Sequence, residues 1–185
     1  MRRLPEEYIS PAAVLVHHAV VKEALILGAG RGFTGVANRD VPLDRTLAEH
    51  ERRSVLAFVA SIEALFRHDL RNPGRPKGEL RRGFRKLRRD AAAAGRRGVP
   101  WDRLMAYRAG LVSAEARGAF GQYVEIVRYR NWLAHGRNYR PRNQFAALDL
   151  EAVTAVAVRM LRAITARPDL KVALYQQVLE AIVEE

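Results

Sequence analysis

The sequence predicts an all-α fold, an antiparallel bundle of about five to seven helices. Apolar residues recur with the 3.6-residue period of a helix along much of the chain, and no segment shows the alternation typical of a strand. Glycine and proline separate the periodic segments. With 185 residues, 49% of them hydrophobic, the chain can build one domain with a sizeable core. We therefore predict a single helical domain over residues 1–185.

Composition excludes several classes of site. The chain contains no cysteine, which rules out disulfides, thiolate-bound metals and a cysteine nucleophile. An H-E-x-x-H motif is also missing, so zinc hydrolysis ranks last and neither a metal nor a cofactor is expected. The N-terminus lacks the apolar core of a signal peptide, and we expect no membrane-spanning run. These features predict a cytoplasmic protein.

Residues 1–40 predict an N-terminal helix and a glycine-rich connection. Ser10 suits the N-cap position, and proline follows it at the first helical position. The helix is expected to cover residues 11–27, because a helix tends to end where glycines accumulate. These glycines are Gly28, Gly30 and Gly32.

Two features of this region are given ordinary interpretations. Residues 30–35 match the G-x-G-x-x-G spacing of a dinucleotide site, but a helix precedes them where a strand is required, which favours a connection. His17 and His18 are adjacent and point about 100° apart on a helix. We interpret them as surface or partly buried histidines that do not share one small site.

A long helix is predicted over residues 44–70, with Asp44 as its N-cap. Glu63 lies at the margin of its apolar face, where a carboxylate can pair with Arg67 one turn later. The apolar face itself consists of Val55, Phe58, Val59, Ile62, Leu65 and Phe66.

Positive charge concentrates in residues 71–110, which we interpret as a basic insertion. The whole chain carries a net charge of +12; from Arg67 to Arg108 there are 14 basic and 4 acidic residues, so this region accounts for most of the excess. A short helix over residues 78–94 has an apolar stripe of only three residues, Leu80, Phe84 and Leu87. Its charged face favours either a solvated surface or contact with the RNA backbone, through Arg81, Arg82, Arg85, Lys86, Arg88 and Arg89.

Four further helical segments complete the prediction. One or two turns are expected from residue 101 to 108, and a helix over 114–135 follows Ser113 as N-cap. Asp149 is expected to cap a helix running to Ala166, and Pro168 to start a last helix that ends near Val183.

The 114–135 helix ends in an unusual stretch, residues 128–137. Asn131 falls in the middle of its apolar face and His135 at the edge. A buried polar group costs about 1–3 kcal/mol unless it is hydrogen-bonded, so such residues are found mainly where a network or a site compensates. The apolar residues of this face are Phe120, Tyr123, Val124, Val127 and Ala134.

Arg130, Asn131 and His135 together resemble the signature of the HEPN superfamily, an arginine followed four to six residues later by a histidine. The resemblance covers residues 44–70 and 114–165 and implies a HEPN-like core over about 44–165. It implies a metal-independent endoribonuclease that works as a homodimer, with two motifs forming one composite site. It also implies a toxin or defence role, with an antitoxin or a nucleotidyltransferase as partner. In one subfamily a tyrosine stands two residues after the histidine; here Arg137 occupies that position and Tyr139 lies further on.

The resemblance assigns chemistry to each motif residue. His135 suits proton transfer because imidazole titrates near neutral pH, and a forked, permanently charged arginine suits the phosphate. Asn131 would orient the imidazole or contact the phosphate, and Glu63 would orient the arginine or the histidine. Arg128 is an alternative arginine, since a straight helix places it about 20° from His135 and Arg130 about 140° away. The family pattern favours Arg130, and Arg137 is added to the RNA-binding residues.

Two other functions fit the same residues. A non-catalytic HEPN-like module would bind RNA without cleaving it, and a helical adaptor or antitoxin would use the basic face against an acidic protein. In a purely structural interpretation, His135 and Arg137 complement the dipole of a helix C-terminus and Asn131 satisfies a local network.

Overall fold

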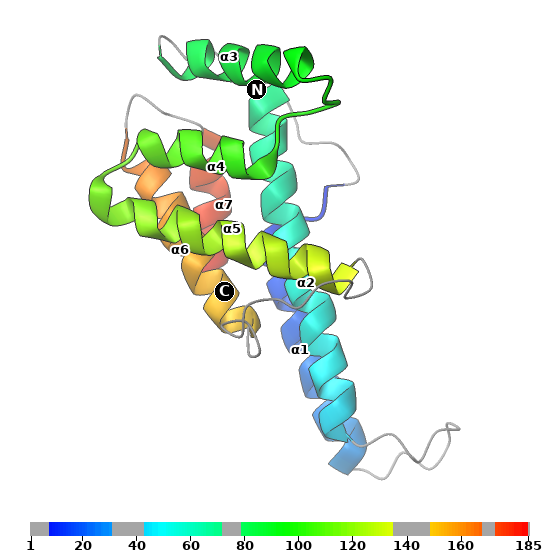
Figure 1. Ribbon diagram of the computed structural model, residues 1–185. Helices are drawn as coiled ribbons and strands as arrows, with labels where there is room; N and C mark the ends of the chain where they lie inside the picture. Colours follow the sequence, from blue (N-terminus) through cyan, green and yellow to red (C-terminus); the bar gives the residue numbers. More distant parts are fainter. Residues whose placement is uncertain (1–7, 31–42, 72–78, 135–148, 168–172, 185) are drawn as a thin grey trace.

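The computed structural model describes residues 8–30, 43–71, 79–134, 149–167 and 173–184 (Figure 1). Within these ranges the chain is all-α, as predicted, and no strand occurs. The helices are α1 (Pro11–Gly30), α2 (Leu43–Arg71), α3 (Glu79–Ala93), α4 (Trp101–Gly110), α5 (Ala114–Ala134), α6 (Leu150–Thr165) and α7 (Ala173–Val183).

Helix α2 is the element on which the others assemble. It packs against α1, α5 and α6, while α4 packs on α5, and α7 packs on α6 and α1. Figure 1 shows α1 and α2 side by side in opposite directions, with α3 lying across the far end of α2. The predicted apolar face of α2 is confirmed, because Phe58, Ile62 and Phe66 are fully buried. Continuous burial of one helical face holds the bundle together.

Three predicted N-caps are confirmed by hydrogen bonds. Ser10 Oγ accepts from the Ala13 amide at 3.1 Å, and Ser113 Oγ accepts from the Ala116 amide at 3.4 Å. Asp149 Oδ1 accepts from the Ala152 amide at 2.7 Å. Each side chain satisfies an amide that has no partner within its own helix.

Some predicted boundaries are wrong. Helix α2 begins at Leu43, so Asp44 lies in its first turn and does not cap it; a carboxylate there still suits the helix dipole. Helix α1 continues through Gly28 to Gly30, because glycine costs a helix only about 1 kcal/mol and does not terminate it by itself. A helix leads into the G-x-G-x-x-G segment, whose residues 31–35 lie outside the described residues. Pro168, the expected start of the last helix, lies outside the described residues.

A membrane prediction also needs correction. The segment Pro11–Gly28 is long and apolar enough to cross a membrane by length and composition, and only 17% of it is buried. This segment has the composition of a membrane-spanning helix because its apolar residues occur all around the helix and not only on the face that packs on α2.

The first part of α2 and most of α1 form a two-helix arm. We define the α1–α2 arm as residues 15–28 and 43–53; its far end extends beyond the other helices in Figure 1, while Glu51 contacts Leu150 at the start of α6. None of these residues is fully buried, whereas ten residues of α2 beyond position 53 are buried. The core therefore lies in the part of the molecule that α4 to α7 surround.

Candidate functional site

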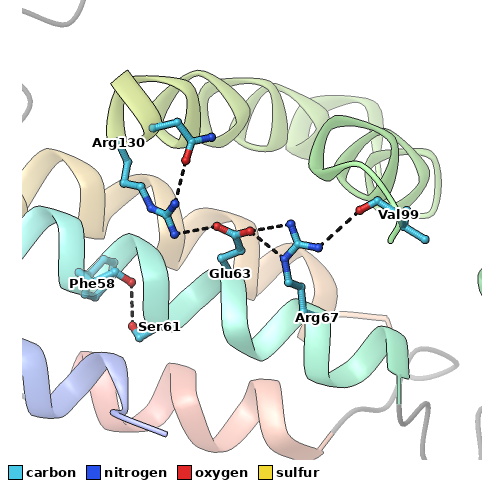
Figure 2. Close-up of polar contacts among 7 residues, drawn as sticks. Phe58, Ser61, Glu63, Arg67, Val99 and Arg130 are labelled. Atoms are coloured by element: carbon cyan, nitrogen blue, oxygen red, sulfur yellow. Dashed lines mark hydrogen bonds and ion pairs between the residues drawn. The ribbon is translucent and has the colours of Figure 1, made fainter. Parts of the chain in front are cut away.

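Glu63 on α2 is the centre of a polar network between α2 and α5 (Figure 2). Its neighbours Ile62 and Phe66 are buried, so the carboxylate lies at the edge of the core with its side chain 14% exposed. Oxygen Oε1 accepts from Arg67 Nε and Nη2, both at 2.7 Å. Oxygen Oε2 accepts from Arg130 Nη2 at 3.0 Å. The predicted pair with Arg67 is confirmed, and the alternative contact with the motif arginine is present as well.

Arg130 is held on two sides. Its Nη2 donates to Glu63, and its Nη1 donates to Asn131 Oδ1 at 2.8 Å. The side chain remains 23% exposed, so solvent reaches part of the guanidinium. Two charge-assisted contacts to one planar group fix its orientation. The amide that the sequence placed on an apolar face thus has a defined partner.

Arg128 is placed differently. Its side chain is 60% exposed and pairs with Glu125 on the same helix. The predicted catalytic residues Glu63, Arg130 and Asn131 come together, and Arg128 contacts the carboxylate of Glu125. His135, Arg137 and Tyr139 lie outside the described residues.

Tyr123 lies near this network, and the sequence did not single it out as a functional residue. It is fully buried on α5. Burial raises the pKa of its hydroxyl well above the ordinary value, the nearby Glu63 carboxylate raises it further, and Arg130 opposes both effects. Its hydroxyl has no hydrogen-bond partner within the described chain. The sequence signal was present, because Tyr123 shares the predicted face with Asn131, but its position looked like ordinary core.

The basic helix is confirmed as helix α3. Leu80 and Phe84 are buried and Leu87 is partly buried, so the helix docks by one narrow edge. The Phe84 and Tyr107 rings lie 5.9 Å apart, and a side chain at Gly83 would collide with Tyr107. The six predicted RNA-binding residues of this helix are all exposed: Arg81, Arg82, Arg85, Lys86, Arg88 and Arg89.

One cation counted in the basic region is not on the surface. Arg108 is fully buried and forms an ion pair with Asp69. Its Nη2 donates to the Tyr175 hydroxyl at 3.1 Å, and that hydroxyl donates to Asp69 Oδ2 at 3.1 Å. The guanidinium also lies 4.8 Å from the centre of the Phe84 ring. This contact set joins α4, α2 and α7, and no sequence signal predicted it because its members are far apart in the chain.

A histidine cluster lies where α1 meets α2. His18 Nδ1 is 2.9 Å from Ser54 Oγ and its Nε2 is 3.3 Å from Glu51. The His50 ring stacks on His18 with 4.8 Å between centres, and His50 Nε2 donates to the His18 carbonyl at 3.2 Å. Burial lowers the pKa of His18, Glu51 opposes this, and His50, Lys22 and His17 add to the lowering.

The cluster borders an open groove of about 310 Å³ between α1, α2 and the start of α6. Glu51 also accepts from the Leu150 amide at 2.6 Å, so it links the arm to α6. Within the described ranges no group of three His, Asp or Glu side chains is arranged to hold a metal ion. His17 is exposed and His18 is partly buried, as the ordinary interpretation of these two histidines predicted.

Comparisons with known proteins found no match to this chain. No protein-family model, no curated protein and no solved structure matches the chain. The functional argument consequently depends on the residues themselves.

Proposed function

We propose that this protein is a metal-independent endoribonuclease of HEPN type that cleaves single-stranded RNA and acts in the cytoplasm as a toxin or defence effector. One observation carries the proposal. Near the C-terminal end of α5, five residues before His135 in the sequence, the guanidinium of Arg130 is held by Glu63 and Asn131. It remains partly exposed to solvent. An oriented, solvent-accessible guanidinium suits a phosphodiester.

In the proposed reaction the ribose 2′-oxygen attacks phosphorus and the bond from phosphorus to the 5′-oxygen breaks. The 2′-hydroxyl gives up a proton, and the leaving 5′-oxygen takes one. His135 performs one of these transfers, and Arg130 stabilises the charge on the phosphorane. Two transfers call for two proton-transferring groups, and a second copy of the chain would supply the other. The products are a 2′,3′-cyclic phosphate and a 5′-hydroxyl.

Glu63 is a positioning residue in this proposal. Its carboxylate binds Arg67 and Arg130 at once, which keeps Arg130 from swinging away when no substrate is present. Within the part of the chain that the structure describes, Arg130 makes these contacts through Nη1 and Nη2, which leaves its Nε edge for the phosphate. Preorganised charge of this kind needs little rearrangement in the transition state.

Cleavage in EDTA tests the proposal. Wild-type protein should cut single-stranded RNA, and His135→Ala and Arg130→Ala should each lose about 10²- to 10⁴-fold in kcat. Arg117→Ala is the matched control, since Arg117 is an exposed arginine of the same helix α5, and should keep activity; Arg128→Ala tests the alternative arginine of the motif. Failure of the wild type to cut RNA, or equal cutting by His135→Ala, would remove the proposal.

The role of Glu63 has its own test. Glu63→Gln should lower kcat with little change in KM, because the substrate still binds while Arg130 is less firmly oriented. Glu125→Gln removes the carboxylate that pairs with Arg128 and should leave both constants unchanged. Equal losses in the two variants would assign Glu63 no special role.

The exposed basic face of α3 favours a second candidate, a module that binds RNA without cutting it. Under either function, Arg85→Glu with Arg89→Glu should weaken RNA binding and flatten its salt dependence. Arg117→Glu with Arg162→Glu makes the same change in net charge at exposed sites outside α3 and should have a smaller effect. Binding that survives His135→Ala without any product ends would favour the second candidate. An adaptor or antitoxin that meets an acidic protein predicts no RNA binding even at low salt.

A further inference from the structure

Arg67 is a second oriented guanidinium beside the candidate site. It lies on α2 one turn after Glu63 and donates from Nε to Glu63 Oε1, and its Nη2 lies 2.7 Å from the same oxygen. Its Nη1 donates to the Val99 carbonyl at 3.5 Å, and its Cζ lies 5.9 Å from the centre of the Trp101 ring. Contacts with three different groups fix the plane of the guanidinium.

The groups that hold Arg67 are themselves fixed by the core. Val99 is buried, and Trp101 is nearly so. The Trp101 ring packs against the rings of Phe66 and Tyr123, with 5.9 Å and 6.3 Å between the ring centres. A side chain held by packed neighbours presents its charge at a constant place, as a binding site requires.

Arg67 retains donors for a ligand. A guanidinium carries N–H donors on all three nitrogens, two of them on each terminal nitrogen. The contacts with described residues use one donor on each nitrogen, which leaves one on Nη1 and one on Nη2. The side chain is 36% exposed, compared with 23% for Arg130. Neighbouring N–H groups on one planar cation suit the oxygens of a phosphate.

Glu63 balances only one of two guanidinium charges. Arg67 contacts its Oε1 and Arg130 contacts its Oε2, and Figure 2 shows the carboxylate between the two cations. These three groups together therefore keep one positive charge. Two cations separated by a single carboxylate lie close enough to contact neighbouring phosphates of one strand, which carry one negative charge each.

The contact with Val99 leads from the motif toward the basic helix. Val99 follows Arg97 by two residues in the connection between α3 and α4, so their Cα atoms are at most about 7 Å apart. Arg96 and Arg97 are both exposed. The Arg96 amide donates to the Ala91 carbonyl at 2.9 Å, which holds this connection against the end of α3. Exposed positive charge thus continues from Arg67 to α3.

We propose that Arg67 binds the phosphate adjacent to the one that Arg130 contacts, and that it directs a single strand of RNA from the end of α5 toward residues 94–100 and helix α3. This inference rests on the proposed function, which supplies the role of Arg130 and the identity of the anion. A cation that contacts a phosphate beside the reacting bond positions the strand without reading its sequence.

An oligonucleotide with one neutral linkage tests which phosphate Arg67 contacts. The probe is 2′-O-methylated except at a single ribose, so only one bond can be cut, and a methylphosphonate replaces the phosphate on one side of that bond. On the side that Arg67 contacts, wild type should lose about 5- to 10-fold in kcat/KM at about 0.1 M salt. Arg67→Gln should lose a similar factor on the fully charged probe and nothing further on the neutral one, because either change removes the same contact.

Arg53→Gln is the matched control. Arg53 is an arginine of the same helix and pairs with Glu49 one turn before it, as Arg67 pairs with Glu63, but it lies in the arm. It should respond to the neutral linkage as wild type does, and circular dichroism checks that each variant is folded. If the neutral linkage on either side lowers the activity of Arg67→Gln as much as that of wild type, Arg67 has only a structural role and the proposal is overturned.

Binding of a strand that cannot be cut separates this proposal from the nuclease proposal. With a fully 2′-O-methylated oligonucleotide, the slope of log affinity against log salt concentration reports the number of phosphate contacts. Arg67→Gln should reduce that slope by about 0.7, whereas Arg67→Lys keeps the charge and should keep most of the slope. A reduced slope in a protein that cuts no RNA would support phosphate binding by Arg67 and remove the nuclease proposal. An unchanged slope in a protein that cuts RNA would overturn the role of Arg67 and leave the nuclease proposal intact.

Discussion

In helix α2, residues 43–53 and residues 54–71 belong to one continuous helix but have different surroundings. The first segment contacts α1 and the start of α6 and buries no residue completely. The second buries ten residues, three of which are polar: Ser54, Ser61 and Asp69. The two segments also differ in an ion pair that each contributes to. The Glu49–Arg53 pair of the first segment is exposed, and the pair of Asp69 in the second segment with Arg108 is buried.

The difference shows where the stability of this protein resides. Both segments have the same helical hydrogen bonds, so these bonds do not make one segment more stable than the other. The segments differ in burial, because apolar area removed from water and buried charge pairs have large effects on the free energy of unfolding. The first segment therefore contributes less to the free energy of unfolding than the second, which forms part of the core. The candidate site at Glu63 lies in the second segment, on a rigid support.

Breaking the buried charge pair should give the largest effect. Asp69→Ala leaves Arg108 charged and buried without its partner and should lower the free energy of unfolding by about 3–5 kcal/mol. Glu49→Ala removes an exposed carboxylate from the first segment of the same helix and should change it by about 1 kcal/mol or less. Urea denaturation measures both.

The double variant Asp69→Leu with Arg108→Met should recover much of the loss, since an apolar pair can replace a buried ion pair. Equal effects of Asp69→Ala and Glu49→Ala would contradict the division of α2 into two segments.

Matched leucine substitutions should give the next largest effect. Leu65 is fully buried, so Leu65→Ala should cost about 2–5 kcal/mol through lost burial and the cavity left behind. Leu47 lies in the arm and is only partly buried, and Leu47→Ala should cost about 1 kcal/mol or less. Thermal and urea unfolding of the two variants, compared with wild type, would show whether the segments differ as the burial indicates.

Acidification should have the smallest effect and should act on the arm. Burial lowers the pKa of His18 from its ordinary value of 6.5, so the unfolded chain binds that proton more readily than the folded one. Its contribution to stability is therefore complete above pH 6.5 and is lost as the pH falls through the lowered pKa. Amide hydrogen exchange should accelerate in residues 43–53 before it does in 54–71. His18→Gln should remove this dependence, and faster exchange in 54–71 first would contradict it.

The two arginines before the motif histidine show what helical projection measures. On a straight helix, angle alone favoured Arg128 as the neighbour of His135, because it counts only the position around the axis, and His135 lies outside the described residues. The contacts of Arg130 with Glu63 and Asn131 were beyond such a projection, since a long side chain reaches across to another helix and a carboxylate at the edge of the core attracts it. Which arginine joins a network depended on where α2 lies relative to α5.

The amino-acid sequence by itself determined the helical class, the N-caps at Ser10, Ser113 and Asp149, the buried face of α2 and the charged face of α3. These follow from contacts within a few residues, where periodicity and local hydrogen bonding decide the outcome. Only the tertiary structure decided that Arg108 is buried beside Asp69 and Tyr175, that Glu63 holds Arg130, and that α1 leaves its outer face uncovered. Those facts depend on how helices that are distant in sequence pack together. The spacing of residues along the chain does not say how far apart two such helices lie in space.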